Sequence, residues 1–300
     1  MGFNAFSDMT VAELEAKLFS SKLRVPKKSR LESILDIVWH NPFKPAPPVE
    51  PSAPISTPLV VPIHGLEETS VDWLKANVYT NKNIDQGACG SCWAFTTVTT
   101  MEALYSINYQ SQKPAEFSVQ YLLDCDTTNY GCDGGWMTDA YLWTIDNGIV
   151  SWNDYPSSYT MKSSKCKPTN GKTKFYNVGA NEVESPSNEE LKAIIRQGPA
   201  GAAFYSDLTC MNHYKSGTLS ASDCNSTCSD PTKKEVNHAV TIVGFGKSER
   251  KDCEEYWLIK NSWGTTWGEQ GHFKWCADRK EKTEEFGGCQ IASFIMFPSM

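Results

Sequence analysis

Residues 86–95 read Gln-Gly-Ala-Cys-Gly-Ser-Cys-Trp-Ala-Phe, with two residues between Cys89 and Cys92. From Ser91 to Asn108 apolar side chains recur at steps of three and four residues, which predicts a helix: Phe95, Val98, Met101 and Tyr105. Cys92 falls in the first turn of this helix. Backbone N–H groups and the helix dipole favour an anion there, so the position stabilises a thiolate.

The Cys89–Cys92 spacing allows three interpretations: half of a zinc site, a redox pair, or a structural cysteine beside a reactive one. A zinc site needs a second close pair, for which Cys224 and Cys228 are candidates, but eleven cysteines spread over residues 89–289 fit disulfides better. A thioredoxin-like redox pair needs a preceding buried strand, whereas residues 81–85 are polar. The third interpretation is therefore favoured.

The composition excludes several classes of protein. The chain has 300 residues, 40% apolar and 21% charged, which is typical of a globular protein. A net charge of −7 argues against phosphate-driven binding of nucleic acid. No apolar run approaches the ~18–20 residues of a membrane span. We therefore expect neither a nucleic-acid partner nor a membrane span.

Cysteine and proline divide the chain. All eleven cysteines follow residue 88, and their odd number leaves one thiol when ten are paired. Eight of the 16 prolines lie between Pro42 and Pro62, which predicts an extended linker. Eleven cysteines indicate an oxidising compartment, yet residues 1–20 do not resemble a signal peptide. We expect that the natural amino terminus is missing from this sequence.

The remaining pattern predicts helices followed by strands, an α+β arrangement in two halves. A second helix is expected from Trp136 to Asn147, ended by Gly148. A third begins at Ser187, with a capping box to Glu190, and ends at residues 198–199. Short β-branched or aromatic runs predict four strands: Ala239–Phe245, Tyr256–Lys260, Phe273–Trp275 and Ile291–Phe297.

A thiolate nucleophile requires a general base, and that base requires an orienting group. His238 stands at the start of the strand predicted over Ala239–Phe245. Asn261 follows in the run Lys-Asn-Ser-Trp-Gly of residues 260–264. An asparagine side-chain carbonyl accepts a hydrogen bond from an imidazole N–H and thereby determines its tautomer.

These segments together resemble the papain family of cysteine proteases, and its cathepsin L-like members in particular. The resemblance is carried by the Cys-Gly-Ser-Cys-Trp run of residues 89–93, by His238 and Asn261 in family order, and by Gly-Cys-Asp-Gly-Gly at residues 131–135. It covers about residues 66–300. It implies a papain-like α+β fold: a mainly helical half, an antiparallel β-barrel-like half, and the active-site cleft between them.

The resemblance also implies roles for single residues. Cys92 corresponds to the nucleophile, and His238 to the base that later protonates the leaving amine. Asn261 orients the imidazole, and Trp263 shields the His–Asn hydrogen bond from water. Gln86 corresponds to the oxyanion donor, assisted by the Cys92 backbone N–H. The resemblance implies an enzyme that needs no cofactor and no metal. An endopeptidase is favoured over an exopeptidase, because no histidine-bearing insertion lies between residues 135 and 166.

The resemblance further implies the substrate-binding residues. Phe294 matches the floor of the pocket for the second residue before the scissile bond, and its walls match Met137, Ala203 and Ala239. Gly134 and Gly135 resemble the backbone that pairs with extended substrate. Tyr130 and Trp136 are expected to flank the next subsite. An all-apolar pocket predicts preference for Leu or Val and poor acceptance of Arg, whose charge would be buried without a partner.

Family disulfides suggest the pairs Cys89–Cys132 and Cys125–Cys166. A third bridge would join Cys289 to Cys224 or Cys228. The cysteines left over have no family counterpart. Cys253 and Cys276 flank neighbouring predicted strands and could pair with each other. Cys210 would then pair with whichever of Cys224 and Cys228 is not joined to Cys289.

The beginning of the chain carries a further resemblance. Gly-Phe-Asn-Ala-Phe-Ser-Asp at residues 2–8 resembles a motif of papain-type prosegments. We interpret residues 1–66 as a partial inhibitory prosegment with its proline-rich linker at 42–62, and residues 67–300 as the mature peptidase domain. This implies a zymogen whose own prosegment inhibits it until removal. The expected enzyme is a monomer that acts on peptides and proteins in a lysosome or other acidic vesicle, or after secretion.

Two other classes of protein are compatible with parts of the sequence. A thiol–disulfide oxidoreductase would use Cys89 and Cys92 as a redox pair, and would show a disulfide between them. A disulfide-rich binding protein without activity would not require Cys92, His238 and Asn261 together, so their presence argues against it.

Overall fold

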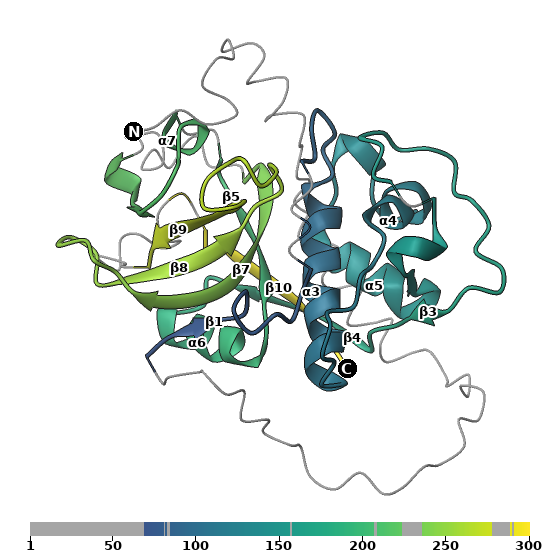
Figure 1. Cartoon of the computed structure of the whole chain (residues 1–300), viewed down its shortest axis with the longest axis horizontal. Helices are drawn as coiled ribbons and strands as arrows, with labels where there is room; N and C mark the ends of the chain where they lie inside the picture. The colour runs from purple at the N-terminus through teal and green to yellow at the C-terminus, as the bar shows by residue number, and fades with distance from the viewer. Residues whose placement is uncertain are drawn as a thin grey trace, which may run out of the picture.

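The computed structural model describes residues 69–80, 82, 85–156, 158–206, 209–223, 236–277, 289 and 291–300. These residues form a helical part and a sheet part, with one long helix, α3, along the boundary between them (Figure 1). The predicted prosegment and its linker lie outside the described residues, as do Cys224 and Cys228.

The helical half is built on α3, which packs against the other two helices on one side and against the sheet on the other (Figure 1). Its helices are α3 (Cys92–Asn108), α4 (Val119–Cys125) and α5 (Met137–Asn147). The hydroxyl of Ser118 caps α4 by accepting from the Tyr121 N–H, and α5 stops at Gly148, whose φ of 65° suits glycine. The half is completed by η1 (Gly131–Asp133), η2 (Trp152–Asp154), and the pair β2 (Ile149–Val150) and β3 (Lys174–Phe175).

The sheet half contains eight strands in the order β4-β10-β5-β7-β8-β9-β6, with β1 paired to β7. The strands are β1 (Val71–Asp72), β4 (Gly179–Glu184), β5 (Ala200–Phe204), β6 (Thr218–Leu219), β7 (His238–Lys247), β8 (Glu255–Lys260), β9 (His272–Cys276) and β10 (Phe294–Ser299). Neighbours run antiparallel, except that β6 is parallel to β9. Helix α6 (Asn188–Gln197) packs on β7; α7 (Thr209–Asn212) and η3 (Ala221–Asp223) flank β6.

The predicted papain-like fold with a mostly antiparallel sheet half is confirmed, but this half is not a closed barrel. Over the described residues the strand path has two ends, β4 and β6, which do not pair with each other, so the sheet is open. One end strand, β6, has only two residues, and its single partner among the described strands is β9.

The expected α+β class and its three long helices are confirmed, each helix starting one residue later than its predicted start. Two details differ. The last strand begins at Phe294 rather than Ile291, because Ile291 and Ala292 are buried in a turn. The strict order of helices before strands also fails, since α6 lies between β4 and β5. An apolar run alone does not distinguish a buried turn from a strand.

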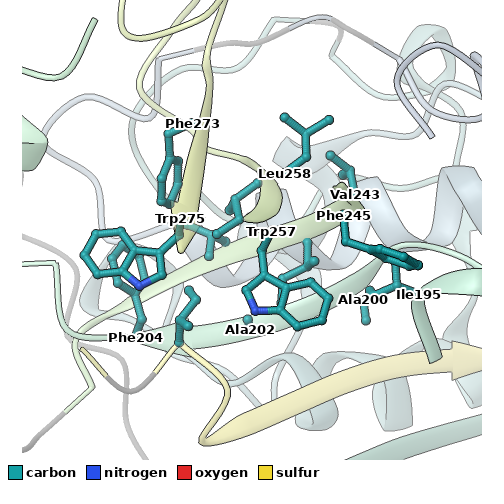
Figure 2. Packing of buried hydrophobic residues seen from close by; sticks show 14 of the residues in the cluster. Ile195, Ala200, Ala202, Phe204, Val243, Phe245, Trp257, Leu258, Phe273 and Trp275 are labelled. Atoms are coloured by element: carbon teal, nitrogen blue, oxygen red, sulfur yellow. The ribbon is translucent and has the colours of Figure 1, made fainter. Parts of the chain in front are cut away.

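The two faces of the sheet pack against different cores. One core holds large aromatic side chains of the sheet itself, including Trp257, Trp275 and Phe204 (Figure 2). The other lies between the sheet and the helices, and joins Ala203, Ala239 and Met296 to residues of α3, α4 and α5. Because α3 borders both halves, 13 of its 17 residues are buried. None of the helices in the described ranges combines the length and apolarity of a membrane span.

Three disulfides link described cysteines. Two are the pairs that the resemblance implied, Cys89–Cys132 and Cys125–Cys166. The third, Cys253–Cys276, joins the ends of β8 and β9. Cys210 and Cys289 are also disulfide-bonded, and the partners expected for them lie outside the described residues. A bond from Cys89 to Cys132 argues against a redox pair between Cys89 and Cys92.

Candidate active site

Cys92 is the first residue of α3 and directly follows the N-cap residue Ser91. Its side chain is buried, and its sulfur is not in a disulfide. The backbone around it is held in place by two contacts: the Cys89–Cys132 bond and a hydrogen bond from the Gly90 N–H to the Cys132 carbonyl at 2.9 Å. The thiol thus lies at the positive end of the helix dipole, where a thiolate is favoured.

His238 is the first residue of β7, and its Nε2 lies 2.8 Å from Oδ1 of Asn261, just after β8. Asn261 Oδ1 also accepts from the Ser262 N–H at 2.8 Å. Since this oxygen is an acceptor, His238 carries its hydrogen on Nε2 and leaves Nδ1 as the basic nitrogen. Nδ1 is buried and has no hydrogen-bond partner among the described residues. An unpaired basic nitrogen of this kind is available to take a proton.

An indole covers the His238–Asn261 pair. The ring of Trp263 stacks on the imidazole at a centroid distance of 5.2 Å and an interplanar angle of 28°. Trp267 in turn packs edge-on against Trp263 at 5.0 Å. Burial lowers the pKa of His238 to about 4, and the hydrogen bond with Asn261 acts in the opposite direction. The imidazole of His238 is therefore neutral near pH 7.

Gln86 is tied to the segment that carries Asn261. Its backbone N–H donates to the Ser262 carbonyl at 2.8 Å, and its Oε1 accepts from the Ser262 hydroxyl at 2.5 Å. Its Nε2 donates to the Cys89 carbonyl at 3.0 Å. An amide NH₂ has two hydrogens, so this bond leaves the second available to a ligand. Ser262, which orients the amide, was not singled out by the sequence analysis.

Three of the four predicted pocket residues form one row across the sheet. Phe294 of β10 pairs with Ala203 of β5, which pairs with Ala239 of β7. Met137, at the start of α5, belongs to the same apolar cluster and is fully buried. Ala203 and Ala239 are also buried, whereas Phe294 is half-buried. The structure thus brings all four side chains into one apolar cluster between the halves.

The glycine segment before α5 approaches other side chains closely. A Cβ on Gly135 would clash with Asn129 Oδ1 and lie 2.8 Å from the Trp93 ring, so only glycine fits there. Gly134 has a φ of 104°, which favours glycine as well. Tyr130 and Trp136 differ in setting: Tyr130 is exposed, but Trp136 is buried and packs edge-on against Phe294 at 5.4 Å. Trp136 therefore contacts the row of pocket residues.

A group of buried ionisable side chains that includes Lys260, the residue before Asn261, joins the sheet half to the helical half. Lys260, the last residue of β8, donates from Nζ to the Thr99 hydroxyl of α3 at 3.2 Å. Glu102, one turn along α3, accepts from the backbone N–H groups of Thr80 and Phe117 at 3.0 Å each. Burial raises the pKa of Glu102 to about 7 and lowers that of Lys260 to about 8. Sequence patterns did not indicate this group, since its members come from distant segments.

Comparison with known proteins places the chain in a family. The model of the papain family of cysteine proteases matches residues 68–299. A cathepsin L-like proteinase of Fasciola hepatica is 32% identical over 99% of the chain and 78% of its own length. A cysteine protease of Ambrosia artemisiifolia, Amb a 11.0101, is 35% identical to this chain. The matched region covers 77% of this chain and 55% of the length of that relative.

The structure also resembles a solved structure of the Amb a 11 cysteine protease, a major ragweed pollen allergen, in its proform. The TM-score is 0.72 and the sequence identity is 30%. The match covers 100% of this chain and 81% of the allergen chain. The two proteins share this α+β fold, in which Cys92 of the present chain stands at a helix end and His238 at the start of a strand. The chain belongs to the papain family of cysteine proteases.

Proposed function

We propose that the chain is an endopeptidase that hydrolyses peptide bonds through Cys92, His238 and Asn261. One observation carries the proposal: the 2.8 Å contact between His238 Nε2 and Asn261 Oδ1, which leaves a buried, basic Nδ1. Trp263 covers this pair, and Cys92 begins the helix that packs against β7. A nucleophile, a base and an orienting group are the parts that covalent catalysis of acyl transfer requires.

In the proposed reaction, His238 Nδ1 takes the proton of the Cys92 thiol, and the sulfur attacks the carbonyl carbon of the scissile peptide bond. The resulting oxyanion is bound by the Gln86 side-chain amide and the Cys92 backbone N–H. The imidazolium then protonates the leaving amine, and an acyl-enzyme remains. Water, deprotonated by the imidazole, hydrolyses the thioester and restores the thiol. The thiolate offsets the cost of charging the buried imidazole.

We expect the pocket lined by Phe294, Met137, Ala203 and Ala239 to take Leu or Val at the second residue before the cut. Arg should be poor there, because the row Phe294–Ala203–Ala239 offers only apolar side chains. Relative values of kcat/KM for matched dipeptide substrates with Leu, Val, Phe or Arg at this position measure the preference. A preference for Arg over Leu would contradict the pocket assignment.

We further propose that residues 1–66 are a partial inhibitory prosegment and residues 67–300 the mature enzyme. The likeness to a proform over the whole chain supports this division, as does a family match that starts at residue 68. Acid incubation should remove residues 1–66, with cleavage in or just after residues 42–62. Lysosomal or other acidic vesicular location, or secretion, and a monomeric state remain parts of the proposal. Amino-terminal sequencing of the processed protein tests the boundary.

The test of the mechanism is the Cys92→Ala variant, compared with wild type after identical acid treatment. The variant should fold, since Cys92 takes part in no disulfide, but should not hydrolyse a fluorogenic peptide. An epoxide that alkylates active thiols should label wild type at Cys92 alone, as read by peptide mass mapping. A folded Cys92→Ala protein with normal activity would refute the mechanism.

A further inference from the structure

A carboxylate of the sheet half contacts the segment that carries the predicted substrate-binding residues. Glu182 lies in β4, opposite Met296 of β10 in the strand register. Its Oε2 accepts two hydrogen bonds, from Trp136 Nε1 at 2.9 Å and from the Thr138 hydroxyl at 2.5 Å. The side chain is half-buried, so both bonds are partly protected from water. Charge-assisted bonds of this kind are stronger than neutral ones and strongly directional.

The position of this carboxylate suits the helix that it touches. Trp136 is the N-cap residue of α5, and Thr138 lies in its first turn. The side chain of Trp136 makes no capping hydrogen bond. A negative charge near this end of a helix is favoured by the dipole and by the unpaired N–H groups there. Glu182 therefore links the start of α5 to β4 through hydrogen bonds to Trp136 and Thr138.

The indole that Glu182 holds is also the neighbour of the pocket floor. Trp136 packs edge-on against Phe294 with an interplanar angle of 80°. The indole N–H fixes the rotation of the ring system, and the ring edge limits how far the Phe294 side chain moves. A chain of contacts thus runs from Glu182 through Trp136 to Phe294. Loss of the carboxylate would release the indole and lengthen the pocket.

We propose that Glu182 is a positioning residue that determines the selectivity of the pocket for the second residue before the scissile bond. It acts through Trp136 on Phe294 and does not itself contact the reacting atoms. This inference rests on the proposed endopeptidase function, since it concerns the same site. It predicts that the size of the accepted apolar side chain depends on a carboxylate outside the pocket lining.

The experiment compares Glu182→Ala, Glu182→Gln and Glu184→Ala with wild type on matched substrates bearing Leu or Phe at that position. Glu184 is a suitable control because it is an exposed glutamate on the same strand, and it is the residue opposite Phe294 in the register. In Glu182→Ala, the kcat/KM of the Leu substrate divided by that of the Phe substrate should fall about tenfold. A change of this size lies within the range by which one methylene group alters selectivity in an apolar pocket. Glu182→Gln keeps an acceptor oxygen and should stay within about threefold of wild type. Glu184→Ala should leave the ratio unchanged.

A merely structural role would lower the yield of active enzyme, measured by titration of the Cys92 thiol, but would leave the ratio per active site unchanged. That result for Glu182→Ala overturns the inference. If Glu182→Ala does not fold, Trp136→Phe removes the donor while keeping an aromatic ring, and should lower the same ratio. An unchanged ratio in Trp136→Phe would overturn the inference as well. Failure of the proposed function would give a different result. Either the wild-type enzyme would cleave neither substrate, or the Cys92→Ala variant would cleave both substrates.

Discussion

The two halves of the molecule hold the side chains of the proposed active site by different means. In the sheet half, His238 and Asn261 stand at the ends of β7 and β8, whose antiparallel register brings Thr241 opposite Lys260. In the helical half, Cys92 stands at a helix end behind a loop that is tied by the Cys89–Cys132 disulfide. Pairing of strands places the proposed base and its orienting group, whereas a disulfide and a hydrogen bond between backbone groups hold the loop before the proposed nucleophile.

The interiors of the two halves both contain large aromatic side chains, such as Trp257 in the sheet half and Trp143 in the helical half. The central helix α3 in addition buries several threonines, whose hydroxyls donate to carbonyls one turn earlier, as from Thr97 to Trp93 at 2.8 Å. Threonine suits a helix that is buried on both sides, because its hydroxyl is satisfied within the helix. The helical half should therefore depend on polar contacts and cross-links in addition to packing.

The largest effect should come from removal of the proposed base, His238, in the sheet half. His238→Ala should lower kcat/KM by about 10³-fold or more, because no other side chain would take the thiol proton. Asn261→Ala should lower it by less, since this change removes orientation but not a reacting group. Steady-state kinetics on one dipeptide substrate, corrected for folded protein, measure both. Equal losses in the two variants would contradict the assignment of base and orienting group.

Packing in the sheet core is tested by Trp257→Ala. Trp257 is 1% exposed and lies in the core of the sheet (Figure 2). The truncation should lower the free energy of unfolding by about 3–5 kcal/mol, through lost burial and the cavity that remains. Denaturant unfolding with disulfides intact, in the Cys92→Ala background to prevent self-digestion, measures this. A loss below about 1 kcal/mol would contradict the importance of packing in this half.

The cross-links of the helical half are tested by Cys125→Ser with Cys166→Ser. This disulfide closes a segment with a sequence separation of 41, so its removal should cost about 4 kcal/mol in the chain-entropy account. The matched control is Cys253→Ser with Cys276→Ser in the sheet half, at a separation of 23. The control should cost somewhat less, because the closed loop is shorter and its ends are also joined by the β8–β9 ladder. A control variant that loses more stability than the helical-half variant would reverse the comparison.

The smallest effect concerns pH. His272 of β9 is buried, with Nε2 at 3.1 Å from the Tyr79 hydroxyl, and burial together with the charge of Lys260 lowers its pKa to about 4. The unfolded state, with a pKa near 6.5, binds the proton more readily, so His272 destabilises the fold as pH falls from 6.5 to 4. In His272→Gln the loss of unfolding free energy over this window should be about 1–3 kcal/mol smaller. Denaturant unfolding at both pH values, in the Cys92→Ala background, measures the difference. An unchanged pH dependence would show that His272 does not contribute.

Prediction from sequence succeeded where the signal is local. The periodicity over Ser91–Asn108 and the capping box at Ser187 lie within single helices, and both features are present in the structure. Prediction failed where burial, and not pairing, explains an apolar run, as at Ile291. The full path of the strands in the sheet also escaped prediction, because pairing joins distant segments and the two-residue strand β6 has a pattern too short to recognise.

By itself the sequence indicated the residues that are proposed to carry the chemistry, because Cys92, His238 and Asn261 stand in short runs whose residue types and order are characteristic. It also determined the α+β class, since periodicity is a property of neighbouring residues. Only the tertiary structure decided which atoms meet across the halves: Ser262 with Gln86, Lys260 with Thr99, and Glu182 with Trp136. These contacts join segments that are 46 to 176 residues apart, and no local pattern encodes the packing that brings them together.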